Sequence, residues 1–402
     1  MAIDGTRSSS VSTGPLTGIK VIDLSTMISG PLAGMMLADQ GAEVIKVESP
    51  DMGDMMRHIG TQKNGMTGIY ALHNRGKKSL VVDLKHDTGK EILRALIKES
   101  DVLIQNFRPG ALKRLGFSYE EVAALNPRLV YVSIAGFGED GPNSGRRVYD
   151  NVIQATSGLA SVQTDKVTGQ PSIYRTLICD KVTAYTASQA ITAALFARER
   201  GGSGQHITLS MLDAAIAFTW PDCAMDEALL DEDVMRLPTI AASYKAIEFS
   251  DGYAVATVLS ESEFRGYCAA LGSPELADDP RFATVQLRGK NDVAYREIIR
   301  GLTSKMTVAQ FLEAAVKYEV PASGLNDLKT VVDEPQVIHN ETFVVREHPI
   351  AGSIREARPA PRFSKTPIQP GHHAPAMGAD TDEIVASLGF DAASMREQGI
   401  VK

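Results

Sequence analysis

One carboxylate and two groups of cations are the residues of this sequence whose types and positions suggest chemistry. Asp180 stands just before a predicted long helix, where it could either cap the helix or act as a nucleophile toward an activated acyl group. A helix dipole favours the ionised form of an acid at its N-terminus, so the sequence predicts that Asp180 is ionised. The local sequence leaves both roles open.

Two basic clusters each adjoin a predicted strand. The first, NRGKKS at 74–79, precedes a strand, and the second, NFRPG at 106–110, follows one, with Lys113 and Arg114 close behind. In open α/β sheets ligands bind near the carboxyl ends of strands, so these cations could converge on a phosphate-rich ligand through charge-assisted hydrogen bonds. The alternative is a solvated charged surface.

A turn at Ser29-Gly30-Pro31 lies between a predicted strand and a predicted helix. The free backbone N–H groups of such a helix start could bind a phosphate or a carboxylate, and the alternative is a plain tight turn. This turn lacks the G-x-G-x-x-G pattern of dinucleotide-binding folds, so we do not predict an NAD site. We interpret Tyr149-Asp150-Asn151 as turn and capping residues.

No metal site is predicted, because the eight histidines do not have the spacing of metal ligands. The three cysteines, Cys179, Cys223 and Cys268, lie far apart and form no C-x-x-C pair. Their odd number also argues against a disulfide framework, which predicts a protein of the reducing cytoplasm.

The composition predicts a soluble globular protein of two or three structural units, since 44% of the 402 residues are hydrophobic. With 41 Lys and Arg against 49 Asp and Glu, the formal charge is 41 − 49 = −8. This mild acidity argues against nucleic acid or an anionic membrane as a partner. No apolar run approaches the roughly 18 residues of a transmembrane helix.

The elements that must position these residues follow from the alternation of β-branched runs with helical periodicity, which predicts an α/β fold with a mostly parallel sheet. Strands are predicted at 19–24, 43–48, 80–84, 102–106, 129–134 and 205–211. Helices are predicted at 32–40, 88–100, 181–200 and 212–219.

Changes in composition and in the pattern of turn residues along the chain predict the domain organisation. Residues 1–14 form a flexible leader, 15–220 a large domain, 221–341 a small α+β domain with a hairpin near 250–252, and 342–402 a C-terminal segment. This last segment carries six prolines before a short helix at 382–388, so we expect an extended wrap that then docks on another surface.

The succession of motifs resembles the class III coenzyme A transferases. The matching segments are PLTGIKVIDLSTMISGPLAGMMLADQGAEVIKVE at 15–48, NRGKKSLVVDLK at 74–85, DVLIQNFRPGALKRLGF at 101–117, GFGEDGPNSGRRVYDNVIQATSG at 136–158, GQHITLSMLD at 204–213, DDPRFAT at 278–284 and APAMGADTDEIV at 374–385. They span nearly the whole chain, and their order is far more specific than any one of them.

The resemblance implies a Rossmann-like CoA-binding large domain, completed by the C-terminal segment, and two subunits interlocked as a homodimer. It also implies that Asp180 is the catalytic nucleophile. Its carboxylate attacks the donor thioester to form a mixed anhydride, and CoA thiolate then gives an aspartyl-CoA thioester that passes CoA to a carboxylic acid. CoA and acyl-CoA are thus substrates, and no tightly bound cofactor is expected.

The CoA contacts implied by the resemblance lie in three segments. They are Ile28 and Ser29 near the reactive end, Asn74, Arg75, Lys77 and Lys78 around the adenine and phosphates, and Asn106, Phe107, Arg108 and Arg114 at the nucleotide end. Some relatives carry Gln in place of Ile28 and Lys in place of Ala135. The Gly-rich lid of the formyl-CoA transferase branch is absent, so a formyl-CoA:oxalate enzyme is not predicted.

Two alternatives remain beside the transferase. An α-methylacyl-CoA racemase needs an acid-base pair across the α-carbon, but Tyr149 stands where that branch has a histidine. A noncatalytic CoA-binding subunit would keep the basic clusters without needing Asp180. The sequence does not identify donor or acceptor, although Arg146, Arg147 and Arg175 could pair with the second carboxylate of a dicarboxylate such as succinate.

Overall fold

The computed structural model describes residues 14–165, 168–236, 239, 241 and 244–402. The chain divides into two compact units. The large unit joins the chain up to Ala228 to the segment Glu341–Lys402, and the small unit is Leu229–Asn340. The large unit extends beyond the predicted boundary at residue 220, because helix α9 (Met211–Cys223) continues through Pro221.

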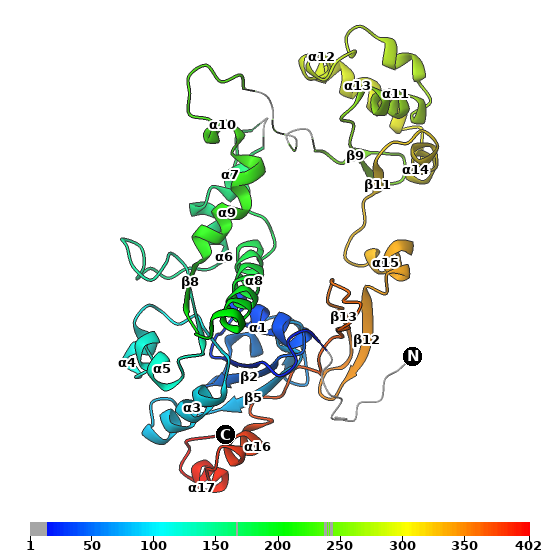
Figure 1. The fold of residues 1–402 in the computed structure, drawn as a ribbon. Coiled ribbons are helices and arrows are strands. Elements are labelled where there is room, and N and C mark those ends of the chain that lie inside the picture. Colours follow the sequence, from blue (N-terminus) through cyan, green and yellow to red (C-terminus); the bar gives the residue numbers. More distant parts are fainter. Residues whose placement is uncertain (1–13, 166–167, 237–238, 240, 242–243) are drawn as a thin grey trace. The chain divides into compact units, whose positions relative to one another are not determined.

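A parallel six-stranded sheet forms the centre of the large unit (Figure 1). Its strands are β1 (Lys20–Asp23), β2 (Glu43–Glu48), β5 (Lys77–Val81), β6 (Val102–Gln105), β7 (Val130–Ala135) and β8 (His206–Ser210). They are ordered β5-β2-β1-β6-β7-β8, and all neighbours run parallel. Counted along the chain this is the order of doubly wound Rossmann folds. The predicted α/β class and parallel sheet are confirmed.

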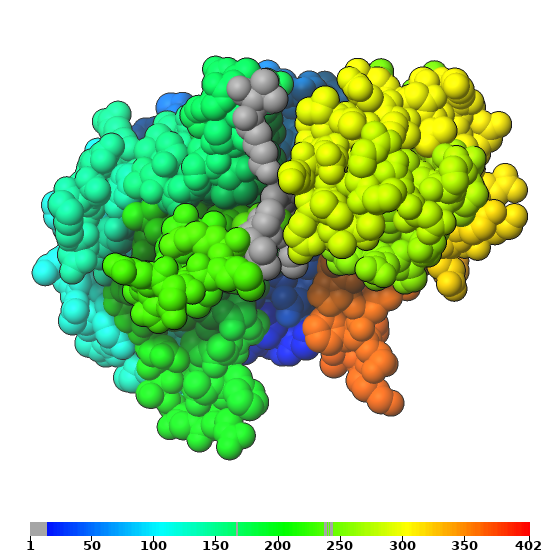
Figure 2. Space-filling view, turned by 90° about the horizontal axis from the view of Figure 1, so that it is seen from above, coloured from blue at the N-terminus to red at the C-terminus, as the bar shows by residue number. Residues whose placement is uncertain are grey.

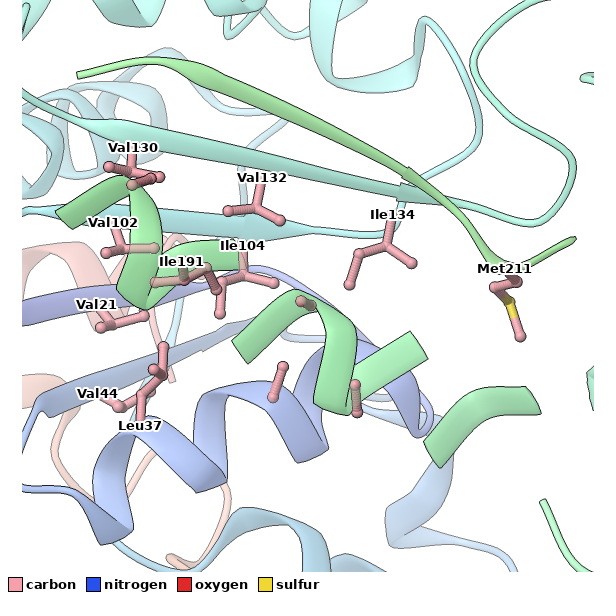
Figure 3. Close-up of a cluster of buried hydrophobic side chains, with 14 of the residues drawn as sticks. Val21, Leu37, Val44, Val102, Ile104, Val130, Val132, Ile134, Ile191 and Met211 are labelled. Carbon is pink, nitrogen blue, oxygen red and sulfur yellow. The ribbon is translucent and has the colours of Figure 1, made fainter. Parts of the chain in front are cut away.

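Each face of this sheet buries its own hydrophobic core, because successive strand residues point to opposite sides. On one face Val21, Val44 and Val102 pack with Leu37 of α1 (Ser29–Asp39) and Ile191 of α8 (Ile178–Gly201), as Figure 3 shows. The opposite face packs against α3 (Asp87–Glu99), α5 (Tyr119–Leu125) and α16 (Thr381–Ser387). Helices α1 and α8 therefore pack on the same face of the sheet and contact each other.

The predicted start of one strand was wrong. Strand β5 spans Lys77–Val81, whereas the pattern placed it at 80–84. The pattern excluded the polar run Lys77, Lys78 and Ser79, but Lys77 and Ser79 are fully buried in the structure. Hydrogen bonds to other segments of the chain offset the cost of burying these polar groups. Lys77 Nζ donates to Asp23 Oδ2, and the Ser79 N–H donates to Asp380 Oδ2.

The C-terminal segment covers the outer edge of β5, where α16 lies beside this strand and α17 (Ala392–Glu397) packs against α16 (Figure 1). The Ser79 N–H donates to Asp380 Oδ2 over 2.9 Å, and the Val81 N–H donates to Thr381 Oγ1 over 3.1 Å. The segment is not extended throughout, since β12 (Phe343–His348) and β13 (Gly352–Ala357) form an antiparallel hairpin that the proline content concealed.

The small unit has its own core beneath a three-stranded antiparallel sheet of β9 (Ile247–Glu248), β10 (Tyr253–Ala256) and β11 (Ala322–Gly324). The predicted hairpin near 250–252 joins β9 to β10. The main helices are α11 (Glu261–Ala270), α12 (Val285–Lys290), α13 (Asp292–Thr303) and α14 (Val308–Lys317). In Figure 2 they appear as a closely packed body of yellow-green and yellow residues.

Shorter elements complete the two units. They are β3 (Gln62–Lys63), β4 (Met66–Thr67), α2 (Gly68–Asn74), α4 (Ala111–Arg114), α6 (Asp150–Thr156), α7 (Leu159–Val162), α10 (Met225–Ala228) and α15 (Pro335–His339). Within the described ranges no helix is both long and apolar enough to cross a bilayer.

Candidate active site

The order of the sheet reverses between β1 and β6, and a doubly wound sheet binds ligands outside the carboxyl ends of its strands at such a point. Strand β1 leads through 24–28 into α1, and β6 leads into the loop that begins at Asn106. The structure therefore brings two of the predicted segments, at Ile28 and at Asn106, to the same edge of the sheet.

Asp180 meets the start of α1 at this edge. The hydroxyl and the backbone N–H of Ser29, the first residue of α1, lie close enough to its carboxylate to lower the pKa of Asp180. The residue that precedes this helix, Ile28, supplies no side-chain cap, and the carboxylate of Asp180 lies near backbone N–H groups that no local side chain binds. Asp180 is the third residue of α8 and does not cap its own helix, which corrects that local reading.

A second carboxylate caps the helix of Asp180. Asp150 is buried, and its Oδ2 accepts the Asp180 backbone N–H over 3.0 Å. Gln154 Nε2 donates to Asp150 Oδ1 over 2.6 Å and so holds this carboxylate in place. The start of α8 also lacks a local cap, because Leu177 precedes it. Asp150 on α6 thus positions Asp180 on α8, which in turn meets Ser29 on α1.

Burial and the charge of Asp150 raise the pKa of Asp180 to about 7, against the opposing hydrogen bonds from Ser29. The sequence predicts an ionised Asp180, but burial raises its pKa and leaves this carboxylate only partly ionised near neutral pH. A carboxylate with this pKa is more basic than an ordinary one and is still substantially ionised near neutral pH. Burial likewise raises the pKa of Cys179 to about 12, so the neighbouring thiol stays neutral.

The first basic cluster is occupied by contacts inside the protein. Arg75 and Lys77 are buried, and each pairs with an aspartate over 2.7 Å, Asp39 for Arg75 and Asp23 for Lys77. Lys77 Nζ also donates to Oδ1 of the buried Asn74 over 2.8 Å. The first cluster lies at the amino end of β5, with Lys77 and Lys78 inside the strand, whereas the second cluster follows β6 at its carboxyl end. The predicted convergence of the two therefore does not occur.

The same cluster attaches the C-terminal segment to the sheet. Arg75 Nη1 donates to the Ala357 carbonyl oxygen over 2.9 Å, and the partly exposed Lys78 lies 3.2 Å from Glu383 Oε1. Lys78 also lies 3.4 Å from Glu43 Oε1. These cations therefore stabilise the covering of the edge strand.

The second cluster is more accessible. Arg108 and Arg114 are exposed, and neither guanidinium group forms an ion pair with another residue that the structure describes. Phe107 is half-buried, and its N–H donates to Gln105 Oε1 over 2.9 Å. The amide of Asn106, in contrast, bonds to the backbone of Thr26 through both of its polar atoms. Arg108 and Arg114 are thus the predicted cations that remain available for phosphates.

The sequence reading missed the roles of Asp150 and Gln154. Their i, i+4 spacing on one helix is typical of a side-chain hydrogen bond. A second signal was that apolar residues, Ile28 and Leu177, precede two of the helices. A helix without a local cap leaves backbone N–H groups that need a hydrogen-bond acceptor from another part of the chain. For the described residues, no cluster of His, Cys, Asp and Glu side chains has the form of a metal site.

Comparison with known proteins gives a consistent result. The model of CoA-transferase family III matches residues 16–381. The succinate–glutarate CoA-transferase of Agrobacterium fabrum is 35% identical over 385 residues, covering 93% of this chain and 96% of that protein. The human succinyl-CoA:glutarate CoA-transferase is 34% identical over 378 residues, covering 93% and 86%. The crystal structure of a CAIB/BAIF family protein from Brucella suis superposes with a TM-score of 0.82 at 32% identity, covering 93% and 99%.

Proposed function

The chain belongs to CoA-transferase family III, and we propose that it moves CoA from an acyl-CoA thioester to a carboxylic acid through covalent intermediates on Asp180. The observation that carries this proposal is the buried carboxylate of Asp180 near Ser29 at the start of α1, with a pKa raised to about 7 and its backbone N–H bound by Asp150. This supports the proposal, since a basic, oriented carboxylate near the edge of the sheet where ligands bind would be a competent nucleophile.

In the first half-reaction, a carboxylate oxygen of Asp180 attacks the carbonyl carbon of the donor thioester. The C–S bond breaks, CoA leaves as a thiolate, and an acyl-aspartyl anhydride remains. The thiolate then attacks the Asp180 carbonyl carbon and expels the donor as its carboxylate, which leaves an aspartyl-CoA thioester. No net proton is exchanged.

The second half-reaction reverses these steps with the acceptor. Its carboxylate attacks the aspartyl-CoA carbonyl and expels CoA thiolate, which then attacks the acyl carbon of the new anhydride and frees Asp180. When Asp180 carries CoA, the donors on Ser29 face an acyl oxygen that becomes an oxyanion in each tetrahedral intermediate. Ser29 would thus stabilise both the free carboxylate and the transition states.

We propose a dicarboxylate as one partner of the reaction. Support comes from the relatives, whose names specify succinate, succinyl-CoA and glutarate. Arg146, Arg147 and Arg175 are candidates for the second carboxylate, and the Arg146 guanidinium lies over the Phe137 ring with its carbon 5.3 Å from the ring centroid. The direct test is a screen of acyl-CoA donors against mono- and dicarboxylic acids with mass detection. If no acyl-CoA yielded a new thioester with any acid, the proposed function would be wrong.

Reversing the charge of both Arg108 and Arg114 is expected to raise Kd for CoA by about 10- to 100-fold, because charge-assisted bonds to phosphates are lost. The salt dependence of binding should weaken with it. Titration calorimetry with CoA at two ionic strengths measures both effects. Lys98→Glu is the control, since it reverses an exposed charge on α3. An equal loss of CoA affinity in Lys98→Glu would show that the effect comes from the overall charge of the protein rather than from a phosphate site.

We propose that the chain acts as an interlocked homodimer. Large aromatic side chains are exposed along α8 and α9, among them Phe196 at 66% and Phe218 at 54%. An exposed apolar surface of this kind is typical of an interface. Sedimentation velocity is expected to give twice the chain mass, and Phe196→Glu with Phe218→Glu to shift it toward the monomer. An active monomer at nanomolar concentration would contradict the proposal.

A further inference from the structure

The loop between β1 and α1, residues 24–28, places Ser29 against Asp180. Met27 lies in this loop with a φ of 71°, in the left-handed region that non-glycine residues rarely occupy. Such a conformation persists only where surrounding groups impose it. The contacts of the loop therefore identify what holds Ser29 in place.

Three consecutive N–H groups of the loop donate to side chains. The N–H of Ser25 donates to Asp23 Oδ1 over 3.0 Å. The Thr26 N–H donates to Asn106 Oδ1 over 2.9 Å, and the Met27 N–H donates to Oδ1 of the buried Asp54 over 3.1 Å.

The carbonyl groups of the segment accept from side chains as well. Asn106 Nδ2 donates to the Thr26 carbonyl oxygen over 2.7 Å, so its amide binds both sides of one residue. Lys46 Nζ donates to the Ser25 carbonyl oxygen over 2.8 Å and lies 2.8 Å from Asp54 Oδ2. Groups from β2, from the segment after it and from the end of β6 thus surround the loop.

Glycine at the start of α1 lets the helix approach this loop closely. A Cβ atom at Gly30 would lie 2.2 Å from Ser25 Oγ. At Gly34, one turn later, it would lie 3.1 Å from Asp23 Oδ2. The helix start is therefore seated directly on the groups that bind the loop, which leaves little freedom for the adjacent Ser29.

We propose that Asn106 is a positioning residue for CoA transfer, which fixes the Thr26 peptide and through it the place of Ser29 against Asp180. This differs from the contact with CoA that the sequence resemblance implied for Asn106. The inference rests on the proposed function, since it assigns to Asn106 a part in the reaction of Asp180.

Loss of the Asn106 amide has a specific consequence at Asp180. Ser29 lowers the pKa of Asp180 and so favours the ionised carboxylate, which means that a displaced Ser29 leaves Asp180 harder to ionise. Asp150 on α6 raises the pKa of Asp180 in both cases, and Cys179 and Lys181 flank it on α8. The first turn of α1 adds no acidic group. A change at Asn106 should therefore appear as a rise in the pKa of Asp180.

The experiment is a double-mutant cycle of Asn106→Ala and Ser29→Ala, followed over pH. Asn106→Ala is expected to lower kcat by roughly tenfold, with KM for acyl-CoA changed less than about twofold. The acid limb of kcat/KM should move up by about half a pH unit or more. The double variant should lose clearly less than the sum of the two single losses, because Ser29→Ala already removes the hydroxyl that Asn106 positions.

Two further variants separate positioning from stability. Asn106→Asp keeps the acceptor for the Thr26 N–H and loses the donor, so it should lie between the wild type and Asn106→Ala. Asn126→Ala is the matched control, since its amide Nδ2 binds two carbonyl oxygens, of Ile97 and Ser100, each over 2.8 Å near the start of β7. It should lower the melting temperature without moving the acid limb.

A raised KM with unchanged kcat and acid limb, and losses additive with Ser29→Ala, would show that Asn106 contacts CoA and overturn the inference. A second measurement, which does not depend on turnover, tests the inference separately from the proposed function. The stability of each protein, compared with its Asp180→Asn counterpart between pH 5 and 9, reports the pKa of Asp180. If wild type transfers no CoA, the function is wrong. If Asn106→Ala leaves that pKa unchanged, the inference is wrong.

Discussion

Asp180→Asn is expected to lower CoA transfer by at least about 10⁴-fold while leaving acyl-CoA binding within about twofold of the wild type. The amide has the size of the carboxylate and still accepts from Ser29, but it cannot form the anhydride. Single-turnover mass spectrometry and calorimetry with CoA measure the two quantities. Asp213→Asn changes an exposed aspartate in the first turn of α9 and serves as the control.

The same experiment separates the transferase from the two alternatives. In a transferase, hydroxylamine or borohydride added during turnover should modify Asp180, because either reagent intercepts an activated aspartyl group. In a racemase, solvent deuterium would instead enter the α-position of a branched acyl-CoA. An unmodified Asp180 together with undiminished transfer by Asp180→Asn would refute the covalent mechanism.

The difference in stability between Asp180→Asn and the wild type should also depend on pH. The pKa of Asp180 is about 7 in the folded protein and about 4 in an unfolded chain, so between these values the folded state binds more protons. The free energy of unfolding of the wild type therefore falls as pH rises from about 4 to 7. Asp180→Asn removes this loss, and its melting temperature should exceed that of the wild type at pH 8 but not at pH 4.

Asp150→Ala is expected to lower kcat/KM by about 100-fold, because a catalytic group displaced by about 1 Å loses that much. The substitution leaves the backbone N–H of Asp180 without its acceptor and removes the shortest hydrogen bond of the Gln154 amide. The start of α8, and Asp180 with it, is then free to shift. Initial rates with the best donor and acceptor, measured at several pH values, test this expectation.

Asp150→Asn distinguishes the hydrogen bond from the charge. It keeps an acceptor for the Asp180 N–H but removes the negative charge that raises the pKa of Asp180. The acid limb of the rate profile should therefore move below pH 7, and much more activity should remain than in Asp150→Ala. Asp87→Ala, in the first turn of α3, is the control. An acid limb unchanged in Asp150→Asn would show that burial alone sets this pKa.

The order of secondary structure in the large unit could be predicted because its signals are local. β-branched runs bounded by Gly, Asp and Pro marked five of the six sheet strands near their observed positions, as for β2 at Glu43–Glu48. Strand β5 was misplaced because Lys77 is buried, and its burial depends on Asp23, 54 residues earlier in the chain. A pattern of hydrophobicity cannot report a partner that distant.

The sequence by itself determined an α/β chain with a parallel sheet, a family resemblance and a carboxylate at the start of a long helix. Only the tertiary structure decided which helix that carboxylate serves, since Asp180 meets Ser29 of α1 and takes its own cap from Asp150 of α6. It likewise decided that Arg75 is enclosed while Arg108 stays exposed. The physical reason is that pKa and availability depend on burial and on charges brought close by folding, and neither is encoded in local spacing.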